Sequence, residues 1–192
     1  MEKRQKGKII LITGGARSGK SAFAEHLAAE NGKNVAYIAT SQIFDEEMKF
    51  RVRLHRQRRP ADWQTYEAPF EAHHAIAEAA ARHDMILFDC ITLYLSNILC
   101  QMKEAELADQ EAVYQLTRQR IGGLVTAAQR VADGGTSTIF VTNEVGAGIV
   151  PENRLSRIYR DISGLANQQI ARESAEVYAV IAGIPVNIKA LA

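Results

Sequence analysis

The sequence is poor in cysteine, in net charge and in long apolar runs, and each shortage narrows the possible functions. Two cysteines, Cys90 and Cys100, stand in apolar surroundings without C-x-x-C spacing, which argues against a disulfide or a metal pair. We therefore expect both cysteines to be reduced thiols in the core of a cytoplasmic protein. The 23 basic and 22 acidic side chains leave a net charge of +1, so neither nucleic acid nor an anionic membrane is expected as a partner. No segment approaches the length of a membrane span.

Linkers, repeats and low-complexity segments are also missing, which favours a single domain. Hydrophobic residues make up 47% of the 192 residues, enough to bury one sizeable core. The apolar run after the basic start is too short for the apolar part of a signal peptide, and no cleavage site follows it. We therefore expect a flexible N-terminal extension over residues 1–7 and one α/β domain over residues 8–192.

What the sequence does contain is an intact phosphate-binding loop. The strand pattern of residues 9–13 runs into Gly14-Gly15-Ala16-Arg17-Ser18-Gly19-Lys20-Ser21, which matches G-x-x-x-x-G-K-[ST], and a helical pattern follows as far as Gly32. Loop N–H groups and the helix N-terminus point at phosphate oxygens, and Arg17 adds a cation. In this motif Lys20 reaches the β- and γ-phosphates and the Ser21 hydroxyl binds Mg²⁺. The eight residues predict a nucleoside-triphosphate site rather than a plain glycine turn.

A second motif of the same chemistry is Met85-Ile86-Leu87-Phe88-Asp89. Four apolar residues that end in an acid at the C-terminal edge of a strand form a Walker B pattern. In that pattern Asp89 holds Mg²⁺ directly or through water, beside the phosphate loop. Glu144, just past a strand over residues 138–142, would lie level with Asp89 if the strands are parallel. It either orients a nucleophile or a metal-bound water, or it fastens a loop.

The order of strand and helix patterns predicts an α/β fold with a mostly parallel sheet flanked by helices. A second strand over residues 34–39 closes a βαβ unit and ends in Thr40-Ser41, at the edge where ligands of open α/β folds bind. The two hydroxyls either contact nucleotide or sugar, or cap the next helix. Two short strands over residues 176–181 and 186–188, joined across Gly183, predict a C-terminal antiparallel hairpin at the sheet edge.

A strongly basic helix is predicted between about Asp45 and Arg59. Six cations surround the single histidine His55 in this segment: Lys49, Arg51, Arg53, Arg56, Arg58 and Arg59. Like charges at helical i, i+4 spacing repel, so either the face is simply solvated or it meets an anionic partner. A neutral imidazole is a competent nucleophile at phosphorus, and neighbouring arginines would stabilise the charge on an attacked phosphate.

Five stretches together resemble one known family. They are GGARSGKS at 14–21, YIATS at 37–41, R-x-x-x-H-x-x-x-R-P at 51–60, DCIT at 89–92 and VTNEVG-x-GIVPENR at 141–154. The combination resembles the bifunctional adenosylcobinamide kinase / adenosylcobinamide-phosphate guanylyltransferases of cobalamin biosynthesis, from about Lys8 to Lys189. The resemblance implies a P-loop NTPase with a RecA-like sheet, assembled as a trimer with sites near subunit boundaries.

The resemblance also implies two reactions and the residues that perform them. The hydroxyl of the aminopropanol arm of adenosylcobinamide takes the γ-phosphoryl of ATP or GTP; a histidine then carries GMP from GTP to adenosylcobinamide phosphate. His55 matches that histidine, Lys20 and Asp89 complete the catalytic set, and Ser21 and Asp89 hold Mg²⁺. Nucleotide contacts are expected from the phosphate loop and from four further residues besides Asp89: Thr40, Ser41, Arg56 and Glu67.

Two other interpretations remain open at this point. The chain is alternatively a RecA-like or regulatory NTP-binding module, in which the basic helix binds a partner rather than GMP. Within enzymes, the alternative is a small-molecule P-loop kinase that lacks guanylyl transfer.

Overall fold

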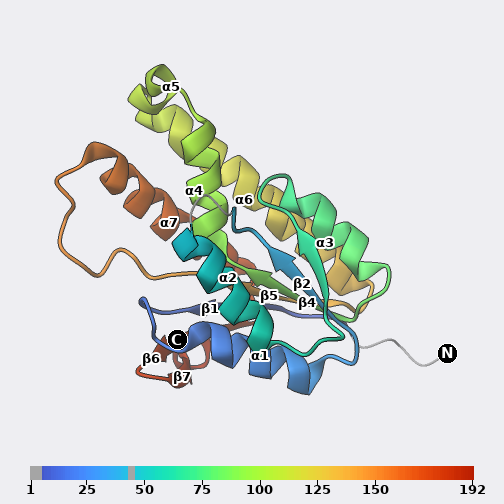
Figure 1. Ribbon diagram of the computed structural model, residues 1–192. Coiled ribbons are helices and arrows are strands. Elements are labelled where there is room, and N and C mark those ends of the chain that lie inside the picture. The colour runs from blue at the N-terminus through green and yellow to red at the C-terminus, as the bar shows by residue number, and fades with distance from the viewer. Residues whose placement is uncertain (1–5, 43–45) are drawn as a thin grey trace.

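The computed structural model describes residues 6–42 and 46–192 of the chain (Figure 1). Asp45, at the expected start of the basic helix, therefore lies outside the described residues. Six helical side chains also lie outside the description: Glu47, Met48, Arg51, His55, Arg58 and Ala105.

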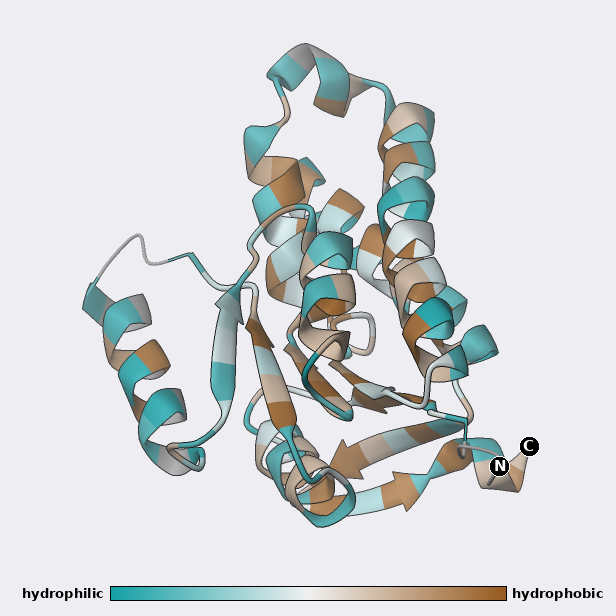
Figure 2. Ribbon diagram, turned by 90° about the vertical axis from the view of Figure 1, so that its right-hand side faces the viewer, coloured by the Kyte–Doolittle hydropathy of each residue, from teal (hydrophilic) through white to brown (hydrophobic). Residues whose placement is uncertain are grey.

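The strands of the described chain form one seven-stranded sheet in the order β3-β2-β4-β5-β1-β6-β7, in which only β7 runs antiparallel to its neighbour. They are β1 (Ile9–Thr13), β2 (Val35–Ala39), β3 (Gln64–Glu67), β4 (Met85–Asp89), β5 (Ser137–Val141), β6 (Glu176–Ile181) and β7 (Ile184–Asn187). The central strands are almost continuously apolar because helices cover both faces of a parallel sheet. Figure 2 shows these strands as hydrophobic bands inside the molecule.

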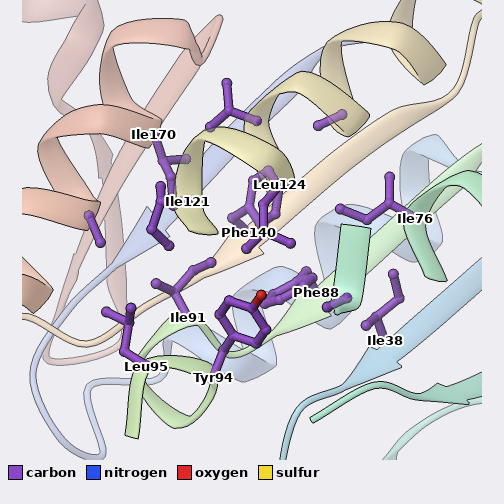
Figure 3. Packing of buried hydrophobic residues seen from close by; sticks show 14 of the residues in the cluster. Ile38, Ile76, Phe88, Ile91, Tyr94, Leu95, Ile121, Leu124, Phe140 and Ile170 are labelled. Atoms are coloured by element: carbon purple, nitrogen blue, oxygen red, sulfur yellow. The ribbon is translucent and has the colours of Figure 1, made fainter. Parts of the chain in front are cut away.

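Helices pack on the two faces unequally. The elements are α1 (Lys20–Asn31), α2 (Glu46–Arg58), α3 (Ala72–Ala80), α4 (Ile91–Gln101), α5 (Glu104–Ala108), α6 (Gln110–Asp133), α7 (Arg154–Glu173) and the 3-10 helix η1 (Ile188–Leu191). The larger core joins one face to α3, α4, α6 and α7; Figure 3 shows Phe88 and Phe140 of the sheet beside Tyr94, Ile121 and Leu124. The smaller core joins the other face to α1. The mostly hydrophilic α2 stands at the side of the sheet (Figure 2).

The strand register brings the ends of five parallel strands into one row. Ala39 pairs with both Glu67 and Asp89, and Val141 pairs with both Asp89 and Ile12. The phosphate loop, Thr40-Ser41 and the segment after β5 therefore leave the sheet at the same carboxyl edge.

The predicted α/β fold class is confirmed: the sheet is mostly parallel and ends in an antiparallel C-terminal pair. The sequence predicted that Asp89 lies beside the phosphate loop. In the structure β5 lies between β1 and β4, so Asp89 is two strands away from that loop.

The prediction for Cys100 was wrong. Cys90 is buried, but Cys100 is exposed. The buried face of α4 contains Ile91, Leu95 and Leu99, and the residue after Leu99 is turned about 100° away from that face.

Candidate active site

The phosphate loop is closed around a buried lysine. The side chain of Lys20 is 8% exposed, and its Nζ donates a hydrogen bond of 3.0 Å to the carbonyl of Gly15. Gly15, Ala16 and Arg17 are exposed at the crest of the loop, while Ser18 and Ser21 are half-buried. Burial lowers the pKa of Lys20, and the nearby Cys90 and Asp89 raise it. The ammonium group of Lys20 and the carboxylate of Asp89 are therefore close enough to interact electrostatically.

Two glycines of the loop are required by its shape. A Cβ on Gly14 would lie 2.5 Å from both the Ser18 hydroxyl and the carbonyl of Val180. Gly19 has φ of 95°, in the left-handed region that glycine adopts without strain. Arg17 also has a positive φ, 57°, which a non-glycine residue adopts only at a cost.

The C-terminal hairpin supports this loop from outside. The N–H of Gly183, in the turn between β6 and β7, donates to the carbonyl of Ser18 at 2.8 Å. In a trans peptide the carbonyl and the following N–H point in opposite directions. With the Ser18 carbonyl directed at the hairpin, the N–H of Gly19 is turned away from the hairpin.

Asp89 is held by groups from the neighbouring strand β2. The hydroxyl of Tyr37 donates to Asp89 Oδ2 at 3.0 Å, and the N–H of Thr40 donates to the Asp89 carbonyl at 3.2 Å. Burial and then the Asp89 charge raise the pKa of Tyr37 well above its usual value, so its hydroxyl keeps its proton. Half-buried Asp89 thus has a defined orientation at the end of β4.

Thr40 is buried completely, and its hydroxyl is used within the protein. The hydroxyl donates to the Cys90 carbonyl and accepts from the Cys90 N–H, both at 2.8 Å. It therefore fastens β2 to the residue after Asp89, and it does not cap α2, which begins at Glu46. Ser41 is half-buried beside it.

Hard oxygen donors for a magnesium ion are present in this space. Ser21 is the second residue of α1, which follows β1. Asp89 is on β4, two strands from β1, and the axes of these two strands are roughly 10 Å apart at the usual strand spacing. Within the described residues, the buried hydroxyls of Thr13 and Ser18 have no hydrogen-bond partner, and no group of three or more His, Cys, Asp or Glu forms a complete metal cage. This donor set fits Mg²⁺, which takes one or two protein oxygens and completes its shell with phosphate and water.

The basic helix α2 is attached to the sheet at its C-terminal end. Arg56 forms an ion pair with Glu67 of β3, with 2.8 Å between Nη2 and Oε1. Arg59, the residue after α2, lies with its guanidinium carbon 3.5 Å from the ring centroid of Tyr37. The backbone of His55 lies within the last two turns of α2, and its side chain is outside the described part of the chain.

Glu144 fastens a loop in this structure. Its N–H donates to the carbonyl of Gly14 at 3.1 Å, which ties the end of β5 to the phosphate loop. Its exposed carboxylate accepts from the N–H of Gly146 at 2.8 Å. Of the two roles considered from the sequence, loop fastening is the one for which contacts are present.

A polar network behind the carboxyl edge could not be assigned from the sequence. The Thr142 hydroxyl donates to Asn167, Asn167 donates to the Asn143 carbonyl, and the Asn143 side chain donates to the Thr92 hydroxyl, at 2.7, 3.3 and 2.9 Å. The network joins the residues after β5 to Asn167 of α7 and to Thr92 in the first turn of α4. The motifs at 89–92 and 141–154 contain three of these residues, but nothing local in the sequence indicates that they meet.

Comparisons with known proteins identify the relatives of the chain. Residues 10–188 match the model of the family described as cobinamide kinase / cobinamide phosphate guanyltransferase (CobU). The chain is 43% identical to "Bifunctional adenosylcobalamin biosynthesis protein CobU" of Escherichia coli (strain K12), over 94% of this chain and 99% of the relative. It is 44% identical to CobU of Salmonella typhimurium, with the same coverage, and 40% identical to "Bifunctional adenosylcobalamin biosynthesis protein CobP" of Pseudomonas aeruginosa, over 93% and 96%.

Among solved structures, the flagellar accessory protein FlaH from Methanocaldococcus jannaschii resembles the chain at a TM-score of 0.49 and 18% identity. The match covers 91% of this chain and 71% of FlaH. Separately, the described helices include none that is both long and apolar enough to cross a membrane.

Proposed function

Because the chain belongs to the cobinamide kinase / cobinamide phosphate guanyltransferase family and is a bifunctional enzyme of cobalamin biosynthesis, we propose that both reactions use the carboxyl edge of its sheet. In this proposal the phosphate loop holds the nucleoside triphosphate and His55 carries GMP. Family membership sets aside a regulatory module and a kinase without guanylyl transfer. The proposed substrates are adenosylcobinamide and adenosylcobinamide phosphate, and the proposed location is the cytoplasm.

For the kinase reaction, we assign binding and charge neutralisation to the phosphate loop. The γ-phosphoryl group of ATP or GTP passes to the aminopropanol hydroxyl, and negative charge spreads over its oxygens in the transition state. Inward N–H groups of the loop and Lys20 would stabilise that charge. Ser21 and Asp89 are the proposed protein ligands of Mg²⁺, which neutralises phosphate charge when bound. The loop–hairpin bond at Ser18 supports this assignment, since it fixes one of the N–H donors before substrate arrives.

For guanylyl transfer, we assign the nucleophile to His55. A neutral ring nitrogen attacks the α-phosphorus of GTP, an N–P bond forms, and the bond to the β-phosphate oxygen breaks to release pyrophosphate. A phosphate oxygen of the cobinamide phosphate then attacks the same phosphorus, and the N–P bond breaks. The product is adenosylcobinamide-GDP, and the histidine returns to its neutral form. The proximity of Arg56 and Arg59 in the chain provides cations for the attacked phosphate.

Arg56 and Glu67 are the proposed nucleotide contacts at the outer end of the site. Their ion pair is exposed, and an exposed ion pair is worth at most about 1 kcal/mol. Opening it to admit a nucleotide therefore costs little. We propose the same nucleotide role for Thr40 and Ser41, with Thr40 restricted to its backbone because its hydroxyl is already used.

A homotrimer is also part of the proposal. The helix α2 lies at the side of the sheet, and it exposes Phe50 and Leu54, which are 50% and 43% accessible. A site completed near a subunit boundary would cover these side chains. Sedimentation equilibrium should then give three times the 21.2 kDa mass of one chain; a monomer at all concentrations would contradict this part.

The observation that carries the proposal is the shared edge of the sheet: the phosphate loop, Asp89 and Glu67, which pairs with Arg56 of α2, all lie on it. Incubation with GTP and Mg²⁺, followed by intact mass measurement, should show one GMP added per chain. The adduct should be labile in acid and stable in base, as expected for a phosphoramidate. The His55→Ala variant should show no added mass. Absence of the adduct in the unaltered protein would refute covalent transfer.

A further inference from the structure

Tyr37 contacts both halves of the proposed site. Its side chain is 5% exposed in the middle of β2, next to β4. The Tyr37 hydroxyl lies 3.0 Å from Asp89 Oδ2. The Tyr37 ring packs against the guanidinium of Arg59, whose carbon lies 3.5 Å from the ring centroid. One buried side chain therefore links the acid of the Walker B strand to the end of the basic helix.

The strand register explains the contact with Asp89. Tyr37 pairs with Leu87 across β2 and β4, and Asp89 is two residues further along the same face. Diagonal neighbours of this kind are within reach of a long aromatic side chain. The bond from a neutral hydroxyl to a carboxylate is charge-assisted, so it restricts the rotation of that carboxylate strongly.

The contact with Arg59 fixes the C-terminal end of α2. Arg59 follows the helix directly and precedes Pro60, so a restraint on its side chain restrains the end of the helix. This contact joins a buried ring to a half-buried guanidinium, so solvent screens it less than the exposed Arg56–Glu67 ion pair. His55 lies four residues before Arg59, about one helical turn.

From these contacts we infer that Tyr37 is a positioning residue shared by the two reactions. Its hydroxyl orients Asp89, and its ring anchors Arg59 and thereby the helix that contains His55. The inference rests on the proposed function for the roles of Asp89 and His55. The two contacts themselves are separable, because one uses the hydroxyl and the other uses the face of the ring.

Two substitutions separate the contacts. Tyr37→Phe removes the hydroxyl and keeps the ring, whereas Tyr37→Leu removes both. Loss of a group that orients a metal ligand typically weakens metal binding about 10- to 100-fold. Tyr37→Phe should therefore raise, by about tenfold or more, the Mg²⁺ concentration for half-maximal binding of a fluorescent GTP analogue. Kinase and guanylylation rates of this variant should recover at high Mg²⁺.

Tyr37→Leu should lose the anchor of α2 as well. In the protein without nucleotide, backbone amides of residues 46–58 should exchange with deuterium at least fivefold faster than in the unaltered protein, while Tyr37→Phe leaves their exchange unchanged. GMP adduct formation by Tyr37→Leu should stay low at high Mg²⁺. If Tyr37→Leu does not fold by circular dichroism, Arg59→Met provides the same test of the anchor with Tyr37 intact.

The matched control is Tyr178→Phe. Tyr178 of β6 donates from its hydroxyl to Glu176 at 2.7 Å, so this variant loses a similar tyrosine–carboxylate bond away from Asp89. Its Mg²⁺ dependence and its exchange over α2 should match the unaltered protein. A Tyr37→Phe variant with ordinary Mg²⁺ dependence, or unchanged α2 exchange on loss of the ring or the guanidinium, would overturn the inference. The Mg²⁺ dependence of nucleotide binding and the deuterium exchange of α2 can both be measured even if no GMP adduct forms. Failure of this inference can therefore be told apart from failure of the proposed function.

Discussion

Lys20 shows how much a single residue of this site depends on its surroundings. The ammonium group is buried and bonds the Gly15 carbonyl, a position from which it can turn to a phosphate. Burial lowers its pKa, and the nearby Cys90 and Asp89 raise it. A triphosphate would add further negative charge beside it and favour the protonated form.

The first prediction concerns this charge. Lys20→Met keeps most of the side-chain volume and removes the ammonium, so phosphoryl transfer should fall at least 10²- to 10³-fold, the usual effect of losing one preorganised donor. Because a buried charge is costly, urea unfolding should give a stability equal to or above that of the unaltered protein. Full kinase activity in Lys20→Met or Lys20→Ala would remove the phosphate loop from the mechanism.

Among individual residues, the sequence predicted those that belong to local motifs. It missed those whose roles depend on the pairing of strands. Lys20, Ser21 and Asp89 belong to short patterns whose chemistry depends on spacing along the chain. The roles of Tyr37 and Thr40 depend on β2 pairing with β4, and their partners lie 52 and 50 residues away. No local pattern contains that information.

Among the elements, the C-terminal hairpin connects stability to the site. Ala182 and Gly183 form its two-residue turn with φ of 52° and 83°, and Ile181 pairs with Ile184. Positive φ at both positions defines a type I′ turn, for which Asn-Gly is preferred. Gly183 suits this conformation, but Ala182 is strained in it. The sequence predicted the hairpin, but its contact with the phosphate loop required the tertiary arrangement.

The second prediction follows from that strain. Ala182→Asn should stabilise the protein by about 0.5–1 kcal/mol, measured by urea unfolding, because asparagine adopts the left-handed region more easily. Gly183→Ala should destabilise it by about 1–2 kcal/mol and should also weaken nucleotide binding, since the distorted turn would withdraw its N–H from Ser18. Unchanged nucleotide affinity in Gly183→Ala, with reduced stability, would show that the hairpin does not support the loop.

The third prediction concerns pH and the attachment of β6 to β1. Glu176 accepts hydrogen bonds from Tyr178 and from Lys8, and these hold its pKa below its usual value of 4.5. A carboxyl whose pKa is lowered by folding stabilises the folded state above the unfolded pKa. That contribution is lost as the pH falls through the folded pKa, because folding then no longer favours the ionised form.

Glu176→Gln should therefore lower the free energy of unfolding at pH 7 by less than about 1 kcal/mol, the range of partly exposed ion pairs. The difference from the unaltered protein should shrink as the pH is lowered through the carboxyl range. Urea unfolding from pH 7 to pH 3 measures it. A difference that is constant across this range would show that the charge of Glu176 has no part in it.

For the whole molecule, the sheet brings the phosphate loop, Asp89 and the Arg56–Glu67 ion pair to one edge. The fold class and the hairpin were predictable because apolar strand patterns alternate with helical ones. The position of β5 between β1 and β4 was not, because strand order is decided by long-range pairing. The attachment of α2 was not predictable either. The basic pattern of this helix is evident in the sequence, but its contacts with β2 and β3 depend on the tertiary structure.

The central claim is that His55 carries GMP from the phosphate-loop edge to the second substrate. The most direct test is a chase: protein labelled with α-³²P GTP is freed of nucleotide and then mixed with adenosylcobinamide phosphate. The account predicts that the label leaves the protein and appears in adenosylcobinamide-GDP without further GTP, and that His55→Ala acquires no label. Label that stays on the protein, or product formed at the normal rate by His55→Ala, would contradict the account.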